Sequence, residues 1–126
     1  MSRRVVITGI GVRAPGGRGS KEFWDLLTAG RTATRRISFF DPSAYRSQIA
    51  GEADFDPVWE GLSQREIRRM DRATQFAVVC AREAVQDSGL DFAGIDPARV
   101  GVSLGSAVAA ATSLEREYLV LSDSGR

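Results

Sequence analysis

The sequence of 126 residues contains no histidine and a single cysteine, Cys80. A Cys-His pair and a Ser-His-Asp triad both use histidine to carry the proton, so neither can form within these residues. A lone cysteine also excludes an internal disulfide. A metal site would have to use carboxylates alone, and we therefore predict none.

Long apolar runs and an excess of one charge are also missing. The 17 basic and 16 acidic residues leave a net charge of +1, which gives no general attraction to nucleic acid or acidic membranes. The longest apolar runs, such as residues 107–111, are too short to span a bilayer, and the N-terminus lacks the apolar core of a signal peptide. We predict a soluble, cytoplasmic protein that binds neither nucleic acid nor membrane.

Apolar spacing predicts strands and helices in alternation. The predicted elements are a strand over 4–8, a helix over 21–29, a weak strand over 49–53, a helix over 71–87, a strand over 100–104 and a helix through 114–121. This order predicts an α/β layered fold with parallel strands. Two confident strands cannot make a stable parallel sheet, which needs cover on both faces, so we expect a truncated chain.

Local signals mark where the predicted helices begin and end. Ser20 is expected to cap the first helix, and Gly30 to end it. Ser63 and Glu66 have the spacing of a capping box, which predicts another helix start. Gly89 is expected to end the helix over 71–87.

One face of the helix over 71–87 carries small and apolar side chains. Its members are Ala73, Phe76, Ala77, Cys80, Ala84 and Val85. A reactive cysteine needs an accessible, electropositive setting, whereas free cysteine in apolar surroundings behaves as a small core residue. We therefore interpret Cys80 as a structural residue.

The segment Gly9-Ile10-Gly11-Val12-Arg13-Ala14 matches the G-x-G-x-x-A pattern of dinucleotide-binding folds. In those folds a helix begins directly behind the glycines and its N-terminus holds the pyrophosphate. Here Pro15, Gly16, Gly17 and Gly19 intervene before the first helix. A tight structural turn after the strand is the favoured interpretation, with a dinucleotide-binding oxidoreductase as a weak alternative.

Two further features leave the function open. The small residues 105–111 follow a strand, and they indicate either close packing of a helix on that strand or room for a slender ligand. Loose basic clusters favour a solvated surface, with docking of an acidic partner as the alternative; they comprise Arg35, Arg36, Arg65, Arg68, Arg69 and Arg72.

Motifs along nearly the whole chain resemble those of the β-ketoacyl-acyl-carrier-protein synthases. In order, they are RRVVITGIG (3–11), PGG (15–17), FWDLL (23–27), FDPS (40–43), MDRATQFA (70–77), DSGL (87–90) and RVGVSLGS (99–106). Within the family, residues 106–126 are most similar to ketosynthase α subunits of bacterial type II aromatic polyketide systems. Fatty-acid synthases of the family carry more glycine where this chain has Ala107 and residues 109–111.

The resemblance implies a thiolase-like fold, a five-layer αβαβα sandwich of which residues 1–126 are an incomplete N-terminal portion. It also implies decarboxylative Claisen condensation: a cysteine takes the acyl chain from acyl carrier protein, and two histidines help to decarboxylate malonyl-acyl carrier protein. No bound cofactor is implied, because the substrates are carried on the phosphopantetheine of the carrier protein.

The family's catalytic cysteine and histidines lie beyond the position that corresponds to Arg126. The resemblance therefore implies no catalytic residue in this chain, and it assigns only Val108, as a residue that lines and gates the acyl pocket. The α subunit of a polyketide ketosynthase, active in antibiotic biosynthesis with a chain-length factor as its partner, is the leading hypothesis. A non-catalytic chain-length factor and a fatty-acid β-ketoacyl synthase are the alternatives within the family, and the starter unit, chain length and product cannot be predicted.

Overall fold

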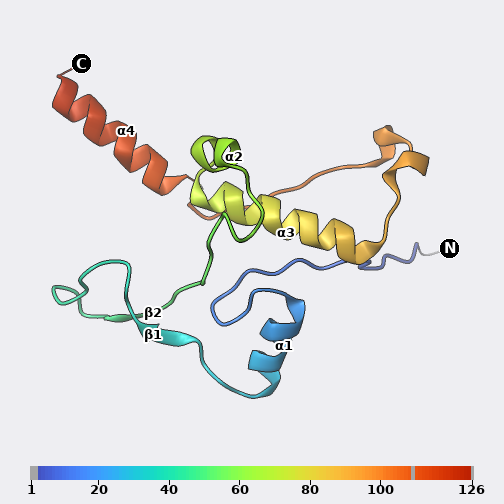
Figure 1. The fold of residues 1–126 in the computed structure, drawn as a ribbon, viewed down its shortest axis with the longest axis horizontal. Helices are drawn as coiled ribbons and strands as arrows, with labels where there is room; N and C mark the ends of the chain where they lie inside the picture. The colour runs from blue at the N-terminus through green and yellow to red at the C-terminus, as the bar shows by residue number, and fades with distance from the viewer. Residues whose placement is uncertain (1–2, 109, 126) are drawn as a thin grey trace.

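The computed structural model describes residues 3–108 and 110–125, which form mainly helices joined by long extended segments (Figure 1). The elements in chain order are α1 (Ser20–Thr28), β1 (Thr34–Arg36), β2 (Ile49–Gly51), α2 (Gln64–Arg69), α3 (Arg72–Ser88), the 3₁₀ turns η1 (Phe92–Gly94) and η2 (Pro97–Arg99), and α4 (Ala111–Ser124). The helix α3 crosses the middle of the molecule, and the hairpin of β1 and β2 lies apart from it.

The strands pair differently from the prediction. β1 and β2 form an antiparallel two-stranded sheet, in which Arg35 lies opposite Ala50. The weak strand predicted over 49–53 is confirmed in its first part, but parallel pairing is wrong for this sheet. The connection, residues 37–48, contains no helix that would carry the chain back over the sheet as a parallel crossover usually does, and the two strands pair as an antiparallel hairpin.

The buried carboxylate of Glu52 ties the hairpin to the segment that follows β1. It accepts hydrogen bonds from the Ser38 backbone N–H at 2.8 Å, the Ser38 hydroxyl at 2.8 Å and the Phe39 N–H at 3.3 Å. Arg35 contributes an ion pair at 3.2 Å. These donors lower the pKa of Glu52 to about 2, the Ser38 backbone bond most and the Ser38 hydroxyl next.

The segments 4–8 and 100–104 are extended but are not strands, which corrects the prediction. Val5 and Val102 are 92% and 96% exposed, respectively. A strand is defined by hydrogen bonds to a neighbouring strand, and the only sheet among the described residues is the hairpin. The two segments therefore have the apolar residues of buried strands, but they lack the strand pairing that would bury those residues.

The helix signals are largely confirmed. Ser63 and Glu66 form a complete capping box at the start of α2, and Gly89 ends α3 in the left-handed conformation with φ of 62°. Gly30 follows α1 with φ of 63°. One cap is wrong: α1 already includes Ser20, and Gly19 precedes it without a side-chain cap.

The buried face of α3 is rotated from the predicted one. Val79 and Gln75 are buried, whereas Ala73 and Val85 of the predicted face are exposed. The predicted Phe76, Ala77, Cys80 and Ala84 are half-buried. The face turns because the core forms against the segment before α2, where Phe55 and Leu62 join Val79, and periodicity alone cannot show where a neighbour packs.

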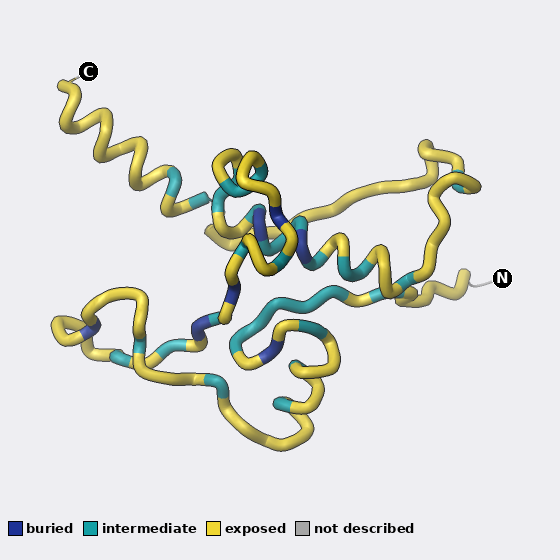
Figure 2. Tube along the Cα trace, viewed as in Figure 1, coloured by how far each residue is buried: buried dark blue, intermediate teal, exposed yellow. Residues whose placement is uncertain are grey.

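Burial is sparse among the described residues: Figure 2 shows a few short, separate buried stretches, and the apolar core lies beside α3. The buried apolar residues are Phe55, Leu62 and Val79, and Phe55 stacks on Phe76 with ring centroids 4.1 Å apart. The accessible surface of 10487 Å² is well above the roughly 6,600 Å² expected of a compact protein of this mass. No helix among the described residues is long and apolar enough to cross a membrane.

Candidate functional site

The glycine segment 9–13 lies directly against α3. A Cβ atom at Gly9 would collide with the carbonyl oxygen of Ala84, and one at Gly11 would collide with the carbonyl oxygen of Cys80. Only a residue without a side chain lets the two backbones come this close. The spacing of the two glycines therefore matches successive turns of α3.

This packing leaves the glycine segment unsuited to a pyrophosphate. The backbone N–H of Ile10 donates to the carboxylate of Asp87 at 2.9 Å, so an anion of the protein itself occupies this donor. The chain then turns at an isolated bridge between Ala14 and Gly17 before α1 begins. A carboxylate beside the segment would repel a phosphate, so the structure favours the structural role. The tight turn that the sequence predicted after the first strand lies at residues 14–17, after Gly9 and Gly11.

Arg13 joins this segment to two other parts of the chain. Its guanidinium pairs with Glu60 at 2.7 Å and with Glu83 of α3, and its side chain is only 12% exposed. The hydrogen bond to Glu60 is the largest cause of a raised Arg13 pKa. No local sequence pattern predicts this cluster of Arg13, Glu60 and Glu83, because its members are up to 70 positions apart.

Cys80 lies on α3, where its backbone contacts Gly11, and it is half-buried. Burial, which disfavours the charged thiolate, raises the pKa of the Cys80 thiol. A nucleophilic cysteine needs the opposite shift. The structural role of Cys80 stays a prediction, and its partial burial and raised pKa agree with that prediction.

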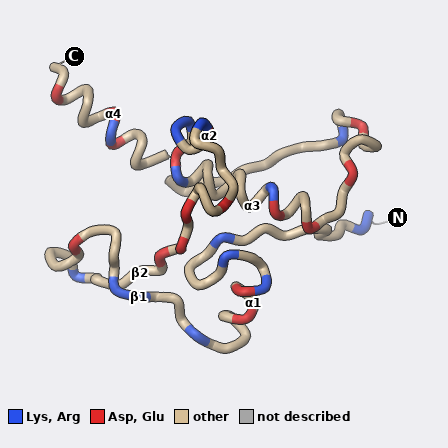
Figure 3. Tube along the Cα trace, in the orientation of Figure 1, with Lys and Arg blue, Asp and Glu red and all other residues tan. Residues whose placement is uncertain are grey.

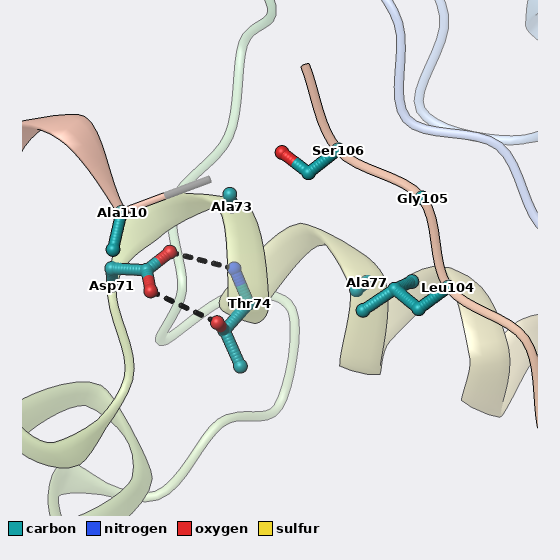
Figure 4. Close-up of a pocket in the computed structure, with 8 residues that line it drawn as sticks. All are labelled: Asp71, Ala73, Thr74, Ala77, Leu104, Gly105, Ser106 and Ala110. Atoms are coloured by element: carbon teal, nitrogen blue, oxygen red, sulfur yellow. Dashed lines mark hydrogen bonds between the residues drawn. The ribbon is translucent and has the colours of Figure 1, made fainter. Parts of the chain in front are cut away.

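A pocket of about 190 Å³ lies between the start of α3 and the small-residue run (Figure 4). Asp71, Thr74 and Ala77 line it from the α3 side, while Gly105 and Ser106 line it from the extended segment. The small residues therefore border an open space as well as a helix. Residue 109 of the run lies outside the described residues.

The polar side chains at the N-terminus of α3 form hydrogen bonds with each other. Asp71 caps the helix by accepting from the Thr74 backbone N–H at 2.9 Å and from the Thr74 hydroxyl at 3.0 Å. The backbone bond is the largest cause of a lowered Asp71 pKa. An acid with a lowered pKa stays ionised at neutral pH and makes a poor proton donor.

Val108, the residue that the family resemblance assigns to the acyl pocket, is 71% exposed. It follows two positions after Ser106, yet it is not one of the residues lining this pocket. Its proposed contact with an acyl chain stays a prediction.

The predicted basic clusters separate in the structure. Arg35 is paired with Glu52 and Asp54, at 3.2 and 2.6 Å. Arg68, Arg69 and Arg72 instead line a second, polar recess beside the start of α4. Among the described residues no group of three or more cysteine or acidic side chains could hold a metal ion.

The comparisons with known proteins identify the family. Residues 2–126 match the model of the β-ketoacyl synthase N-terminal domain. The chain belongs to the β-ketoacyl synthase family. Its glycine segment, α3 and small-residue run therefore lie within a β-ketoacyl synthase N-terminal domain.

Two relatives show how similar the chain is to polyketide enzymes. It is 78% identical over 126 residues to a Streptomyces coelicolor protein named as an actinorhodin polyketide β-ketoacyl synthase, covering 100% of this chain and 27% of that protein. It is 67% identical over 123 residues to the tetracenomycin ketoacyl synthase alpha subunit of Streptomyces glaucescens, covering 98% and 29%. The chain thus spans less than a third of the length of these relatives.

A solved structure supports the ketosynthase fold. The ishigamide ketosynthase/chain length factor matches 98% of this chain and 30% of its own chain, with a TM-score of 0.79 and 31% sequence identity. The arrangement of helices and extended segments is therefore that of a ketosynthase N-terminal region.

Proposed function

We propose that this chain belongs to a polyketide β-ketoacyl synthase, an acyltransferase-type condensing enzyme of antibiotic biosynthesis. The observation that carries the proposal is the 67% identity, over 98% of the chain, to the tetracenomycin ketoacyl synthase alpha subunit. Identity at this level favours an α subunit of a polyketide system over a fatty-acid synthase.

The 126 residues form, in this proposal, the incomplete N-terminal portion of a thiolase-like five-layer αβαβα sandwich. The exposed apolar segments 4–8 and 100–104 support it, because extended apolar chain of this kind is stable when paired within a covered sheet. The coverage of 27% to 30% of the relatives' lengths agrees with such a portion.

The proposed reaction is a decarboxylative Claisen condensation. A cysteine thiolate outside these residues takes the growing acyl chain as a thioester from acyl carrier protein. Malonyl-acyl carrier protein then loses carbon dioxide, and the resulting carbanion attacks the thioester carbonyl. A C–C bond forms, the C–S bond to the enzyme breaks, and the thiolate is regenerated.

This chain contributes scaffold to that reaction. Gly9 and Gly11 let the N-terminal segment pack closely on α3, where Gly11 contacts the backbone of Cys80. Arg13 holds the segment in place through ion pairs with Glu60 and Glu83. Val108 is proposed to line and gate the acyl pocket. Acyl carrier protein and a chain-length factor are the proposed partners, and the cytoplasm is the proposed location.

A non-catalytic chain-length factor is the second candidate. The similarity to the ishigamide ketosynthase/chain length factor is compatible with either kind of subunit. The two candidates differ in one chemical property: only the ketosynthase carries the nucleophilic cysteine.

Covalent loading separates the two candidates. The complete protein that carries these residues is incubated with radiolabelled acyl-acyl carrier protein, then denatured and separated from it. A ketosynthase retains the label as a hydroxylamine-sensitive thioester on a cysteine outside residues 1–126. Absence of label on a folded protein would contradict the proposal and favour the chain-length factor.

A further inference from the structure

An exposed serine that follows two arginines lies just after β1. The segment reads Arg35-Arg36-Ile37-Ser38, and Arg35, Arg36 and Ser38 are all exposed. Among the serines and threonines of the sequence, only Ser38 has arginine at both the second and the third position before it. Basophilic protein kinases select this arrangement, because carboxylates beside their active site bind guanidinium groups on the N-terminal side of the hydroxyl.

The hairpin that carries Ser38 can open locally without exposing the apolar core. β1 and β2 pair over three residues each, and neither strand has a buried residue. The hairpin also lies apart from α3, beside which the core forms (Figure 1). A two-stranded hairpin with little packing is marginally stable, and its exposed hydrogen bonds open readily. Opening presents residues 35–38 as extended chain, which a peptide-binding active site can accept.

The surroundings of Ser38 give a phosphate on its hydroxyl a physical effect. The hydroxyl and the backbone N–H of Ser38 both donate to the Glu52 carboxylate, each at 2.8 Å. The Glu52 pKa of about 2 keeps that carboxylate ionised at neutral pH. A phosphate ester removes the hydroxyl donor and adds a charge of about −1.5 to −2. It therefore places two like charges at close range, where they repel each other.

The two arginines of β1 offer such a phosphate new partners. Arg35 pairs with Glu52 at 3.2 Å and with Asp54 at 2.6 Å. Arg36 donates to the side chain of Gln48 at 3.1 Å, and within the described residues it has no ion pair. Figure 3 shows basic positions on β1 and acidic positions on the segment that leads from β2 to α2. A phosphate, with its higher charge and three acceptor oxygens, competes with Glu52 for Arg35.

We propose that Ser38 is a phosphorylation site for a basophilic serine/threonine protein kinase, and that its phosphate loosens the hairpin of β1 and β2. In the reaction the Ser38 oxygen attacks the γ-phosphorus of a nucleoside triphosphate, and an O–P bond forms. The bond from that phosphorus to the nucleoside diphosphate breaks, and the hydroxyl proton passes to a base of the kinase. The inference does not rest on the proposed condensation activity.

The test incubates the complete protein with the catalytic subunit of cyclic-AMP-dependent protein kinase and radiolabelled ATP. Mass spectrometry of the peptides is expected to locate the phosphate on Ser38, and Ser38→Ala is expected to lose the label. Arg36→Gln should be labelled at least about tenfold more slowly, because a charge-assisted hydrogen bond to the kinase is lost. The matched control is Ser47→Ala, in the same connection but without arginine at the second and third positions before it. It is expected to be labelled like the wild type.

Hydrogen exchange over residues 34–51 measures the effect on the hairpin. These amides are expected to exchange about tenfold faster after phosphorylation, because the loss of the Glu52 contacts lowers the free energy of opening. Ser38→Ala treated with the kinase should exchange as it does untreated, and circular dichroism verifies that each variant is folded. A wild type that takes no label while a reference peptide does, or equal labelling of the wild type and Ser38→Ala, would overturn the proposal. Unchanged exchange in the phosphorylated protein would also overturn it.

Discussion

At the scale of single residues, the contact between the N-terminal segment and α3 gives the two glycines of the G-x-G pattern a structural purpose. Both lie where a Cβ atom would strike a carbonyl oxygen of the helix. The same pattern in the sequence also matches a phosphate-binding loop, since both situations need a backbone without side chains. Only the position of α3 beneath the glycines separates the two explanations.

Gly11→Ala is expected to destabilise the complete protein by about 1–3 kcal/mol, because the added methyl group must push the segment away from the Cys80 carbonyl. Urea unfolding measures the change. Gly94→Ala is the matched control, since a Cβ there meets nothing within 4 Å. Equal effects of the two substitutions would contradict the close packing.

Cys80→Ala is expected to leave condensation by the complete protein largely intact, because this thiol is half-buried and its pKa is raised. The turnover of malonyl-acyl carrier protein by the purified variant measures this. Loss of turnover in a variant that folds and is stable like the wild type would make Cys80 a catalytic residue.

At the scale of elements, the helices were predictable, whereas of the three predicted strands only the one over 49–53 was found, in its first part. The capping box of Ser63 and Glu66 and the stop at Gly89 depend on residues within a few positions, so the sequence alone predicts them. The segments 4–8 and 100–104 have the apolar composition of strands, but pairing depends on distant chain. The face that α3 buries, and the Arg13 cluster, escaped prediction for the same reason.

The Glu52 carboxylate is expected to make the hairpin region sensitive to acid. Its pKa of about 2 lies below the ordinary 4.5, so its stabilising effect is complete above pH 4.5 and disappears as the pH falls toward 2. The variant Glu52→Gln should therefore be less stable than the wild type at neutral pH, by a margin that narrows across this window. Denaturant unfolding at several pH values measures the margin, and a constant margin would contradict the assignment.

Val102→Lys tests whether the segment 100–104 is a strand in the complete protein. Val102 is 96% exposed in the structure, so the substitution costs little if this surface stays open. If the segment pairs within a covered sheet, a buried lysine should destabilise the complete protein by several kcal/mol, on the order of 3. Thermal unfolding of the wild type and of Val102→Lys distinguishes the two cases, and identical unfolding midpoints would contradict the proposal that this segment pairs within a sheet.

At the scale of the whole molecule, the described chain has too little buried surface to be stable alone. Its three buried apolar residues and its large accessible surface resemble part of a domain more than a finished one. We expect the isolated 126-residue chain to unfold without a cooperative transition. Differential scanning calorimetry provides the check, and a sharp heat-absorption peak from the purified monomer would contradict this expectation.

The central claim, membership of a polyketide condensing enzyme, is tested most directly by the reaction itself. The complete protein, with its chain-length factor, is supplied with acyl- and malonyl-acyl carrier protein, and mass spectrometry follows the carrier-bound products. The account predicts release of carbon dioxide together with a β-ketoacyl chain extended by one malonyl-derived unit. A folded protein that forms neither product, while a known ketosynthase does so under the same conditions, would contradict it.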